Sequence, residues 1–472
     1  MIDLKELRAN ADRYRQGALD KGIDVDIDAL LEADDSLRIA TQEYEQLAAE
    51  QNQIGKQIGR LAGRVKKAPA DDRQALVDQM AQLQERPNQI KQRRQPLHKL
   101  IGDLQPRRDE LWLNVPQPAD PDVPRGPDAS GNVEIRQWNP PGFDTSKSFA
   151  QNRGFEPRTH VELGVDLGLM DLQRGVKMAG ARSYVLSGDG MRLHQAILRM
   201  AFDFMVDENG FTPLSVPVLV REAMMVGTGF FPHGKDQTYA IADGQDDDED
   251  PGEPSGRAPA LYLTGTGEVG LMGFHEGEIL DESDLPVRYT TLSTCFRREA
   301  GAAGKDTAGL FRIHQFDKVE QVVICRADQE ESRQWHRKML GYVEALMQRL
   351  ELPYRLLQCC TGDLGPKNAD MVDVECWMPG RGVAGPDGRP TGAWAETHSA
   401  SRLYDYQCRR LNIRNRKEGS KSTVVCHALN NTVAASPRIL IPIMEMYQNE
   451  DGSIRVPDAL QPYMGNKRRI PA

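Results

Sequence analysis

Residues 295–320 combine side chains that could bind a nucleotide and an amino acid. Two segments rich in strand-forming residues, 287–296 and 310–323, flank a loop of Gly, Ala and Asp, which predicts an antiparallel hairpin with a long tip. The residues of interest lie on its two arms: Arg297, Glu299, Arg312, Phe316 and Glu320. Because side chains alternate along a strand, Arg312, Phe316 and Glu320 should project from one face.

That face would offer a guanidinium, an aromatic ring and a carboxylate. Together these groups could bind a phosphate or carboxylate, stack on a base and hold an ammonium group. A hairpin whose scattered charges simply face solvent is the alternative that this stretch leaves open. The sequence has no P-loop and no G-x-G-x-x-G after a strand, so any nucleotide would have to be bound by arginines and strands.

The composition is that of an ordinary globular protein. The 472 residues, 27% charged and 39% hydrophobic, are enough for two or three domains. No apolar run approaches the roughly 18 residues of a membrane-spanning helix, and the N-terminus has no apolar signal core. Seven cysteines without zinc-ligand spacing predict buried, reduced thiols and a cytoplasmic location.

The charge is unevenly distributed. The net charge is −10, but thirteen Lys and Arg against five acidic residues give +8 to the segment from Lys56 to Arg108 and −18 to the remainder. A basic element on an acidic protein predicts contact with a polyanion.

Heptad patterns in this region predict an antiparallel helical hairpin. After short helices expected at 1–22 and 25–33, apolar residues recur with 3-4 spacing from Leu37 to Val65 and again from Leu76 to Leu111. Pro69 should end the first long helix. A dimerising coiled coil or a spacer would have the same pattern, but the exposed Lys and Arg favour an arm that lies along phosphates.

The second long helix is the less regular one. It contains Pro87, Pro96 and Pro106, and an interior proline costs about 3 kcal/mol, so we expect local kinks.

A Pro/Asp/Gly-rich linker at 116–131 should separate this arm, residues 1–115, from a second domain at 132–472. Within that domain the acidic segment 243–259 predicts a disordered insertion. An amphipathic helix at 191–206 precedes a strand interrupted by Pro217, which confines that strand to a sheet edge.

Three motifs of the second domain resemble those of class II aminoacyl-tRNA synthetases. The Arg-x-Glu and Arg-x-x-x-Phe of the hairpin resemble motif 2, and the string FRREAGAAGKDTAGLFRIHQFDKVE is similar to seryl-tRNA synthetases in particular. The helix and Pro217 strand resemble motif 1, which builds the family's dimer interface. A turn at His427 that leads into an apolar helix, with Arg438 in its first turn, resembles motif 3. The basic arm is also a feature of seryl-tRNA synthetases, so the resemblance covers nearly the full length.

The resemblance implies an α+β fold: an N-terminal helical hairpin followed by a catalytic domain built on an antiparallel β-sheet flanked by helices. It implies a homodimer that activates L-serine with ATP and Mg²⁺ and transfers the seryl group to the 3′ end of tRNA(Ser), with tRNA(Sec) as a further candidate acceptor.

The resemblance also implies the residues that bind ATP. Arg297, the first of two catalytic arginines, would bridge the serine carboxylate and the α-phosphate. Glu299 would accept from the adenine amino group, and Phe316 would stack on the ring. Arg312 and the second catalytic arginine, Arg438, would hold the outer phosphates. The full set is Arg297, Arg298, Glu299, Arg312, Ile313, Phe316, Glu396, Thr397, His398, Ser399 and Arg438.

Two of these residues, Glu396 and Ser399, would bind Mg²⁺, which prefers hard oxygen ligands. A lone Glu-x-x-Ser is more often a helix or turn feature. Thr397 and His398 would only line the nucleotide site.

A second set would bind serine. Thr-Gly-Glu at 266–268 is similar to the Thr-Ala-Glu segment of the family, although the residues alone also suit a plain turn. Glu320 would pair with the serine ammonium group, and the pocket as a whole should reject alanine because it hydrogen-bonds a hydroxyl. The full set is Thr266, Gly267, Glu268, Arg297, Glu320 and Thr432.

Five positions depart from the family pattern: Gly267 for alanine, Arg298 for serine, Lys305 for arginine, Arg402 for asparagine and Asn431 for glycine. Two other functions fit parts of the sequence. A paralogue could deliver its activated amino acid to a carrier protein, but the basic arm counts against it. A coiled-coil scaffold would have no use for Arg297, Glu299, Glu396 and Arg438.

Overall fold

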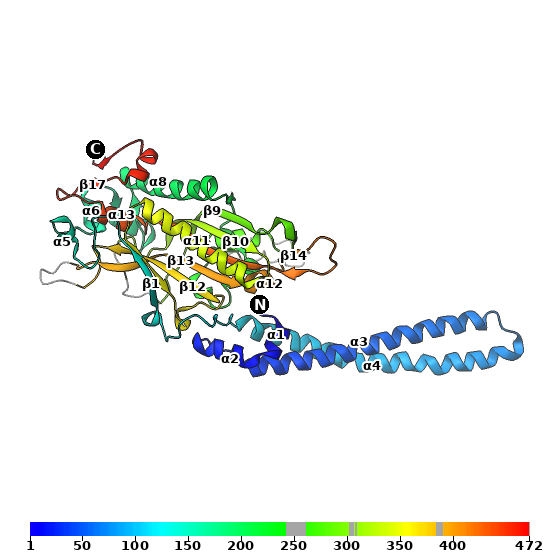
Figure 1. Cartoon of the computed structure of the whole chain (residues 1–472). Helices are drawn as coiled ribbons and strands as arrows, with labels where there is room; N and C mark the ends of the chain where they lie inside the picture. Colours follow the sequence, from blue (N-terminus) through cyan, green and yellow to red (C-terminus); the bar gives the residue numbers. More distant parts are fainter. Residues whose placement is uncertain (242–260, 302–305, 307–308, 384–389, 472) are drawn as a thin grey trace. The chain divides into compact units, whose positions relative to one another are not determined.

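The computed structural model describes residues 1–241, 261–301, 306, 309–383 and 390–471 (Figure 1). The insertion expected at 243–259 and Lys305 lie outside these residues. The chain forms two compact units: Leu4–Arg15 with Asp24–Val115, and Met1–Asp3 with Gln16–Ile23 and Pro116–Ala472. No helix among the described residues is long and apolar enough to cross a membrane.

The first unit contains the predicted helical hairpin. Helix α3 (Ile27–Val65) and helix α4 (Ala70–Asn114) lie antiparallel, side by side (Figure 1). Two short helices precede them, α1 (Leu4–Ala9) and α2 (Ala11–Asp20). The separate helix expected at 25–33 is wrong: Asp26 caps the N-terminus of α3, which then continues without a break.

The seam of the hairpin is the predicted one. Leu47, Ile54 and Ile90 form a buried cluster between α3 and α4. Helix α4 continues through its three prolines, and Arg86 and Arg93 pair with Glu50 and Glu43 of α3 at 2.8 Å. Part of the arm's positive charge is therefore used to join its two helices.

The second unit is built on an eight-stranded sheet. All its neighbouring strands are antiparallel except the last pair. In order across the sheet the strands are β1 (Val133–Trp138), β11 (Tyr354–Gln358), β12 (Asp370–Met378), β13 (Ala393–Tyr404), β16 (His427–Ser436), β10 (Gln315–Cys325), β9 (Val287–Phe296) and β4 (Thr212–Pro213). The strand expected around Pro217 is split: β4 lies at the edge of this sheet, as expected, but it ends at Pro213, and Pro217 itself lies in no strand.

Two long helices, α8 (Asp189–Asp203) and α11 (Gln329–Arg349), cover one face of this sheet (Figure 1). Asp317 of β10 contacts His194 of α8, and Gln321 donates to the carbonyl of Met339 in α11. Because side chains alternate, the neighbouring residues Phe316 and Lys318, one on each side of Asp317, project from the opposite face of β10. That face carries the candidate site.

The remaining elements are short. The helices are α5 (Phe149–Arg153), α6 (His160–Asp166), α7 (Leu172–Ala179), α9 (Glu222–Gly227), α10 (Glu268–Gly273), α12 (Tyr406–Arg410) and α13 (Leu440–Met446). The strands of the small sheets are β2 (Met170–Asp171), β3 (Val185–Leu186), β5 (Leu219–Arg221), β6 (Tyr239–Ala240), β7 (Leu261–Leu263), β8 (Ile279–Asp281), β14 (Arg414–Arg416), β15 (Val424–Val425), β17 (Ile454–Arg455) and β18 (Arg469–Ile470).

Two local expectations are wrong. The second hairpin strand begins at Gln315, not at 310, so Arg312 precedes it and the alternation does not extend back to Arg312. The segment from His427 is the central strand β16 instead of a turn, and Arg438 lies before α13 instead of in its first turn.

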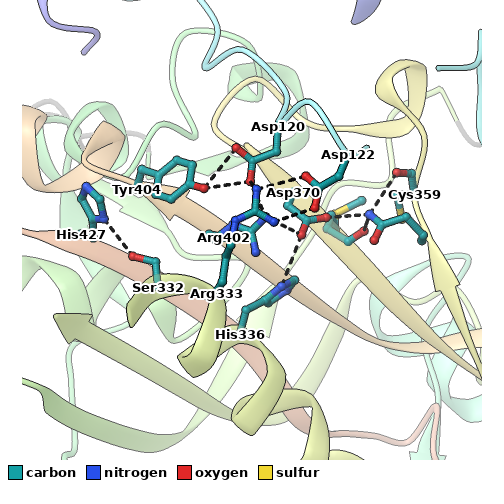
Figure 2. A network of polar contacts seen from close by, with 12 residues as sticks. Asp120, Asp122, Ser332, Arg333, His336, Cys359, Asp370, Arg402, Tyr404 and His427 are labelled. Atoms are coloured by element: carbon teal, nitrogen blue, oxygen red, sulfur yellow. Dashed lines mark hydrogen bonds and ion pairs between the residues drawn. The ribbon is translucent and has the colours of Figure 1, made fainter. Parts of the chain in front are cut away.

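The segment expected as a linker, 116–131, belongs to the second compact unit. Its Asp120 is buried and accepts hydrogen bonds from Arg402, Arg333 and Tyr404 (Figure 2). Arg402 also pairs with Asp370 at 2.9 Å. This network fixes the segment 116–131 against β12 and β13.

Candidate active site

A cavity of about 480 Å³, including its open mouth, lies on the face of the sheet opposite α8 and α11. It is lined by Arg297, Glu299, Leu310, Phe311, Ile313, Phe316, Lys318, Glu396, Thr397, Thr432, Ala435 and Arg438. Most residues predicted to bind ATP are therefore brought together here from β10, β13 and the segments after β9 and β16.

Arg297 is positioned by the end of the β9–β10 hairpin. Its backbone N–H donates to the carbonyl of His314 at 2.9 Å, and its Nε to the carbonyl of Gly265 at 3.4 Å. Its guanidinium lies 5.2 Å from the ring centroid of Phe316. The side chain is exposed to the cavity, so its remaining donors are open to a ligand.

Arg438 approaches the same cavity from the segment after β16. Its Nε donates to the carbonyl of Phe311 and its Nη1 to the carbonyl of Glu396, each at 3.2 Å, and it lies 4.4 Å from the centroid of the Phe311 ring. Burial lowers the pKa of Arg438, and the charges of Arg297 and Arg312 lower it further against the opposing effect of Glu396. Several guanidinium groups this close together favour the binding of an anion.

Glu299 and Arg312 form an ion pair beside the cavity. Arg312 Nη1 lies 2.8 Å from Glu299 Oε2. Glu299 lines the cavity, whereas Arg312 does not. The Nε of Arg312 is buried without a hydrogen-bond partner among the described residues.

A β-bulge explains how Glu396 and Ser399 share a face. Glu396 pairs with Glu375 and Ser399 with Asp373, while Thr397 is the extra residue of β13. Because Asp373 and Glu375 are two residues apart on β12, they and their partners face the same side.

This carboxylate group suits a hard divalent cation. Asp373 Oδ1 is buried and has no hydrogen-bond partner among the described residues. Burial and the neighbouring Glu396 raise the pKa of Asp373 well above its usual range. The nearby Cys359 and Asp363 complete a group of close oxygen and sulfur atoms, but burial raises the pKa of the Cys359 thiol far above neutrality. The residues therefore fit Mg²⁺ through oxygen ligands.

The amino-acid end of the cavity is formed by β10 and β16. Lys318 and Thr432 line it. Thr266 and Glu320 lie behind Lys318 and are buried, with residue exposures of 4% and 2%. Thr432 lies opposite Glu320 in the register, next to a bulge in β16 where Val433 is the extra residue.

Besides Thr266 and Glu320, two more predicted serine-binding residues, Gly267 and Glu268, lie outside this lining. Both oxygens of Glu268 accept from Lys367 Nζ at 2.7 Å, and one accepts from Gln407. Gly267 packs against β9: an added Cβ would lie 2.4 Å from the Thr291 methyl carbon. The Thr291 methyl group thus takes the space that a side chain at position 267, such as the family's alanine, would need.

Besides Arg312, three predicted nucleotide-site residues lie outside the lining: Arg298, His398 and Ser399. Arg298 is exposed and donates its backbone N–H to the Gln237 carbonyl. Ser399 is half-buried. His398 is buried, and this burial lowers its pKa to about 3.

Sequence reasoning missed Phe311, Lys318 and Asp373. Lys318 had a clear signal, because it stands between Phe316 and Glu320 in the same alternating set. No sequence signal pointed to Phe311 or Asp373. The fold of the segment before β10 places Phe311 at the cavity, and the register of β12 against β13 places Asp373 beside Glu396 and Ser399.

Two other positions that differ from the family pattern, Asn431 and Arg402, do not line the cavity. Asn431 points to the helical face, where it donates to the Met339 carbonyl at 3.1 Å. Arg402 is buried in the network with Asp120 and Asp370 (Figure 2).

Comparisons with known proteins agree with this architecture. Residues 255–447 match the model of the tRNA synthetase class II core domain (G, H, P, S and T), and residues 1–105 match that of the seryl-tRNA synthetase N-terminal domain. The serine–tRNA ligase of Deinococcus radiodurans is 39% identical over 99% of this chain and 98% of its own length.

Solved structures give the same result. A seryl-tRNA synthetase from Pyrococcus horikoshii complexed with ATP superposes with a TM-score of 0.78 at 34% identity and covers 100% of this chain and 99% of its own. A cytoplasmic serine–tRNA ligase from Naegleria fowleri in complex with AMP has a TM-score of 0.77 at 28% identity, over 98% of this chain and 95% of its own. The fold is thus that of a class II synthetase. The chain belongs to the seryl-tRNA synthetase family.

Proposed function

We propose that the chain is a serine–tRNA ligase that activates L-serine with ATP and transfers the seryl group to the 3′ end of tRNA(Ser). The observation that supports this most directly is the approach of Arg297 and Arg438 to one cavity that also holds the Phe316 ring. The two arginines come from segments more than a hundred residues apart, so a purely structural role would not require both.

In the first step a serine carboxylate oxygen attacks the α-phosphorus of ATP. The bond from that phosphorus to the bridging oxygen breaks, which gives seryl-adenylate and pyrophosphate. No protein nucleophile is required, so positioning and charge neutralisation supply the rate. Arg297 holds the α-phosphate, and Arg438 the outer phosphates.

The adenine is bound by aromatic and carboxylate groups. Phe316 stacks on the ring, and Glu299 accepts from the exocyclic amine. Phe311, whose ring centroid lies 4.4 Å from the Arg438 guanidinium, also lines the cavity. Ile313 and Thr397 supply its walls.

Glu396 and Ser399 would hold Mg²⁺, with Asp373 next to them, and the ion would neutralise phosphate charge. The residues of the chain meanwhile orient the nucleotide. The Glu396 carbonyl accepts from Arg438, so the strand that presents the carboxylate also aligns the arginine.

The second step needs tRNA. The basic arm supports contact with its backbone: Arg60, Arg64 and Lys67 border one open hollow at the turn between α3 and α4. We propose that this hollow receives phosphates of tRNA(Ser), with tRNA(Sec) as a second acceptor. A homodimer and a cytoplasmic location complete the proposal, the latter supported by seven free, buried cysteines.

Serine-dependent exchange of pyrophosphate into ATP, followed by charging of purified tRNA(Ser), tests the function. We expect both activities, and exchange with alanine should be about 10⁴-fold weaker. Absence of serine-dependent exchange would overturn the proposal. Exchange without charging would favour the paralogue that serves a non-tRNA acceptor.

A further inference from the structure

Lys318 is a buried cation to which the roles described so far give no task. It lies on the cavity face of β10 between Phe316 and Glu320, lines the cavity, and its side chain is only 6% exposed. A buried ammonium group is costly unless it is paired. Lys318 is paired with Glu320, whose side chain is 3% exposed.

Thr266 belongs to the same hydrogen-bonded group, and its hydroxyl makes all of its hydrogen bonds within that group. Its Oγ1 accepts from Lys318 Nζ at 2.8 Å and from the Glu268 backbone N–H at 3.3 Å. It donates to Glu320 Oε2 at 3.2 Å. A hydroxyl has one hydrogen and two lone pairs, so Thr266 has nothing left to offer a substrate.

Lys318 and Glu320 each keep one hydrogen-bonding atom without a partner among the described residues. An ammonium group has three N–H donors, and Lys318 uses two, toward Thr266 and Glu320. No hydrogen bond reaches Glu320 Oε1 from the residues that the structure describes. Lys318 lines the cavity, whereas Glu320 lies behind it.

A zwitterion is the ligand that matches this arrangement. If its ammonium group paired with Glu320 alone, Lys318 would become an unpaired buried cation. A carboxylate on the same molecule removes that cost, because it gives Lys318 a new partner as Glu320 changes partners.

We propose that the α-amino acid inserts into the Lys318–Glu320 ion pair, with its ammonium group on Glu320 and its carboxylate on Lys318. This inference rests on the proposed function and makes Lys318 a substrate-binding residue. One carboxylate oxygen stays with Lys318, while the other attacks the α-phosphorus beside Arg297.

The test compares serine with L-serinamide, which has the ammonium and hydroxyl groups but no carboxylate. In pyrophosphate exchange, Lys318→Met should raise the KM for serine about tenfold or more, since a desolvated charged contact is lost. The Ki of L-serinamide as an inhibitor and the KM for ATP should change less than threefold.

Lys367→Met is the matched control, because Lys367 forms a second buried pair with Glu268 outside the cavity lining. Its KM for serine should change less than twofold. An unchanged KM in Lys318→Met, or equal weakening of serine and L-serinamide, would overturn the inference.

Lys318→Arg covers the case in which the methionine variant does not fold. The larger guanidinium cannot reproduce the contact with Thr266, so the KM for serine should still rise at least threefold with the Ki of L-serinamide preserved. A change below twofold would overturn the inference. Absence of exchange in the unaltered protein would instead remove the proposed function.

Discussion

The guanidinium of Arg312 lies 2.8 Å from the carboxylate of Glu299, so a residue assigned to phosphate is joined to one assigned to adenine. This ion pair also spans the hairpin, because Glu299 follows β9 and Arg312 precedes β10. Glu299 has a positive φ of 52°, a conformation that few residues other than glycine adopt. The pair therefore helps to hold Glu299 in its orientation toward the cavity.

We predict that the two residues are energetically coupled in ATP binding. Arg312→Met and Glu299→Gln should each lower kcat/KM for ATP in pyrophosphate exchange, by about tenfold to a hundredfold. Because each change also disturbs the partner, the double variant should lose less than the product of the single losses, with a coupling of about 0.5–3 kcal/mol. Strictly multiplicative losses would show that the two residues act independently and would contradict the predicted coupling.

Arg438→Ala should abolish exchange while the protein stays folded. The change removes a guanidinium whose charge is needed only when phosphate is bound, and it leaves the Phe311 and Glu396 carbonyls to water. Arg355→Ala is the control, since Arg355 pairs with Glu375 on the same sheet and does not line the cavity. Exchange at a normal rate in Arg438→Ala would refute the role of this arginine.

Local patterns predicted much of this fold. Alternation and loop composition located β9, and the heptads located the hairpin of α3 and α4. Contacts distant in sequence could not be predicted in this way. Glu268 was expected in the pocket, but it is held by Lys367, 99 residues later, and Gln407, 139 residues later. No local pattern reports such partners.

The bulge in β13 illustrates the same limit. Strict alternation places Glu396 and Ser399 on opposite faces, and only the pairing with β12 reveals the extra residue at Thr397. The resemblance to the family supplied what the periodicity could not.

Arg402→Asn, a change to the family's usual residue, should destabilise the second unit by about 3–5 kcal/mol, because it leaves Asp120 and Asp370 buried without their shared cation (Figure 2). Arg333→Ala should cost less, since Arg333 is one-quarter exposed and its other partner, Asp122, is open to solvent. Urea denaturation followed by tryptophan fluorescence measures both. Equal losses of stability in the two variants would contradict the prediction that Arg402 contributes more than Arg333.

His427 should make the stability of the second unit depend on pH. Burial lowers the pKa of His427, whose Nδ1 lies 2.8 Å from the Ser332 hydroxyl (Figure 2). The folded state keeps the ring neutral, while the unfolded chain binds a proton below about pH 6.5. Stability should therefore fall as the pH drops below that value, by up to about 1.4 kcal/mol per pH unit from this residue.

His427→Gln keeps a hydrogen-bonding group but cannot titrate, so this variant should lose less stability than the unaltered protein between pH 6.5 and 5. His98→Gln, at an exposed position of the arm, should behave like the unaltered protein. Parallel curves for the unaltered protein and His427→Gln would exclude the effect.

The arm should be needed for charging and not for activation. Replacing Arg60, Arg64 and Lys67 by alanine removes three positive charges from the hollow at its tip. The KM for tRNA(Ser) should rise, and its dependence on salt should weaken, because fewer counterions are released on binding. Serine-dependent pyrophosphate exchange should stay within twofold, since the cavity lies in the other compact unit.

As a control, Arg86 and Arg93 already pair with Glu50 and Glu43, so replacing them by alanine should change the salt dependence less. Unchanged charging by the tip variant at all salt concentrations would remove the role of this hollow in tRNA binding.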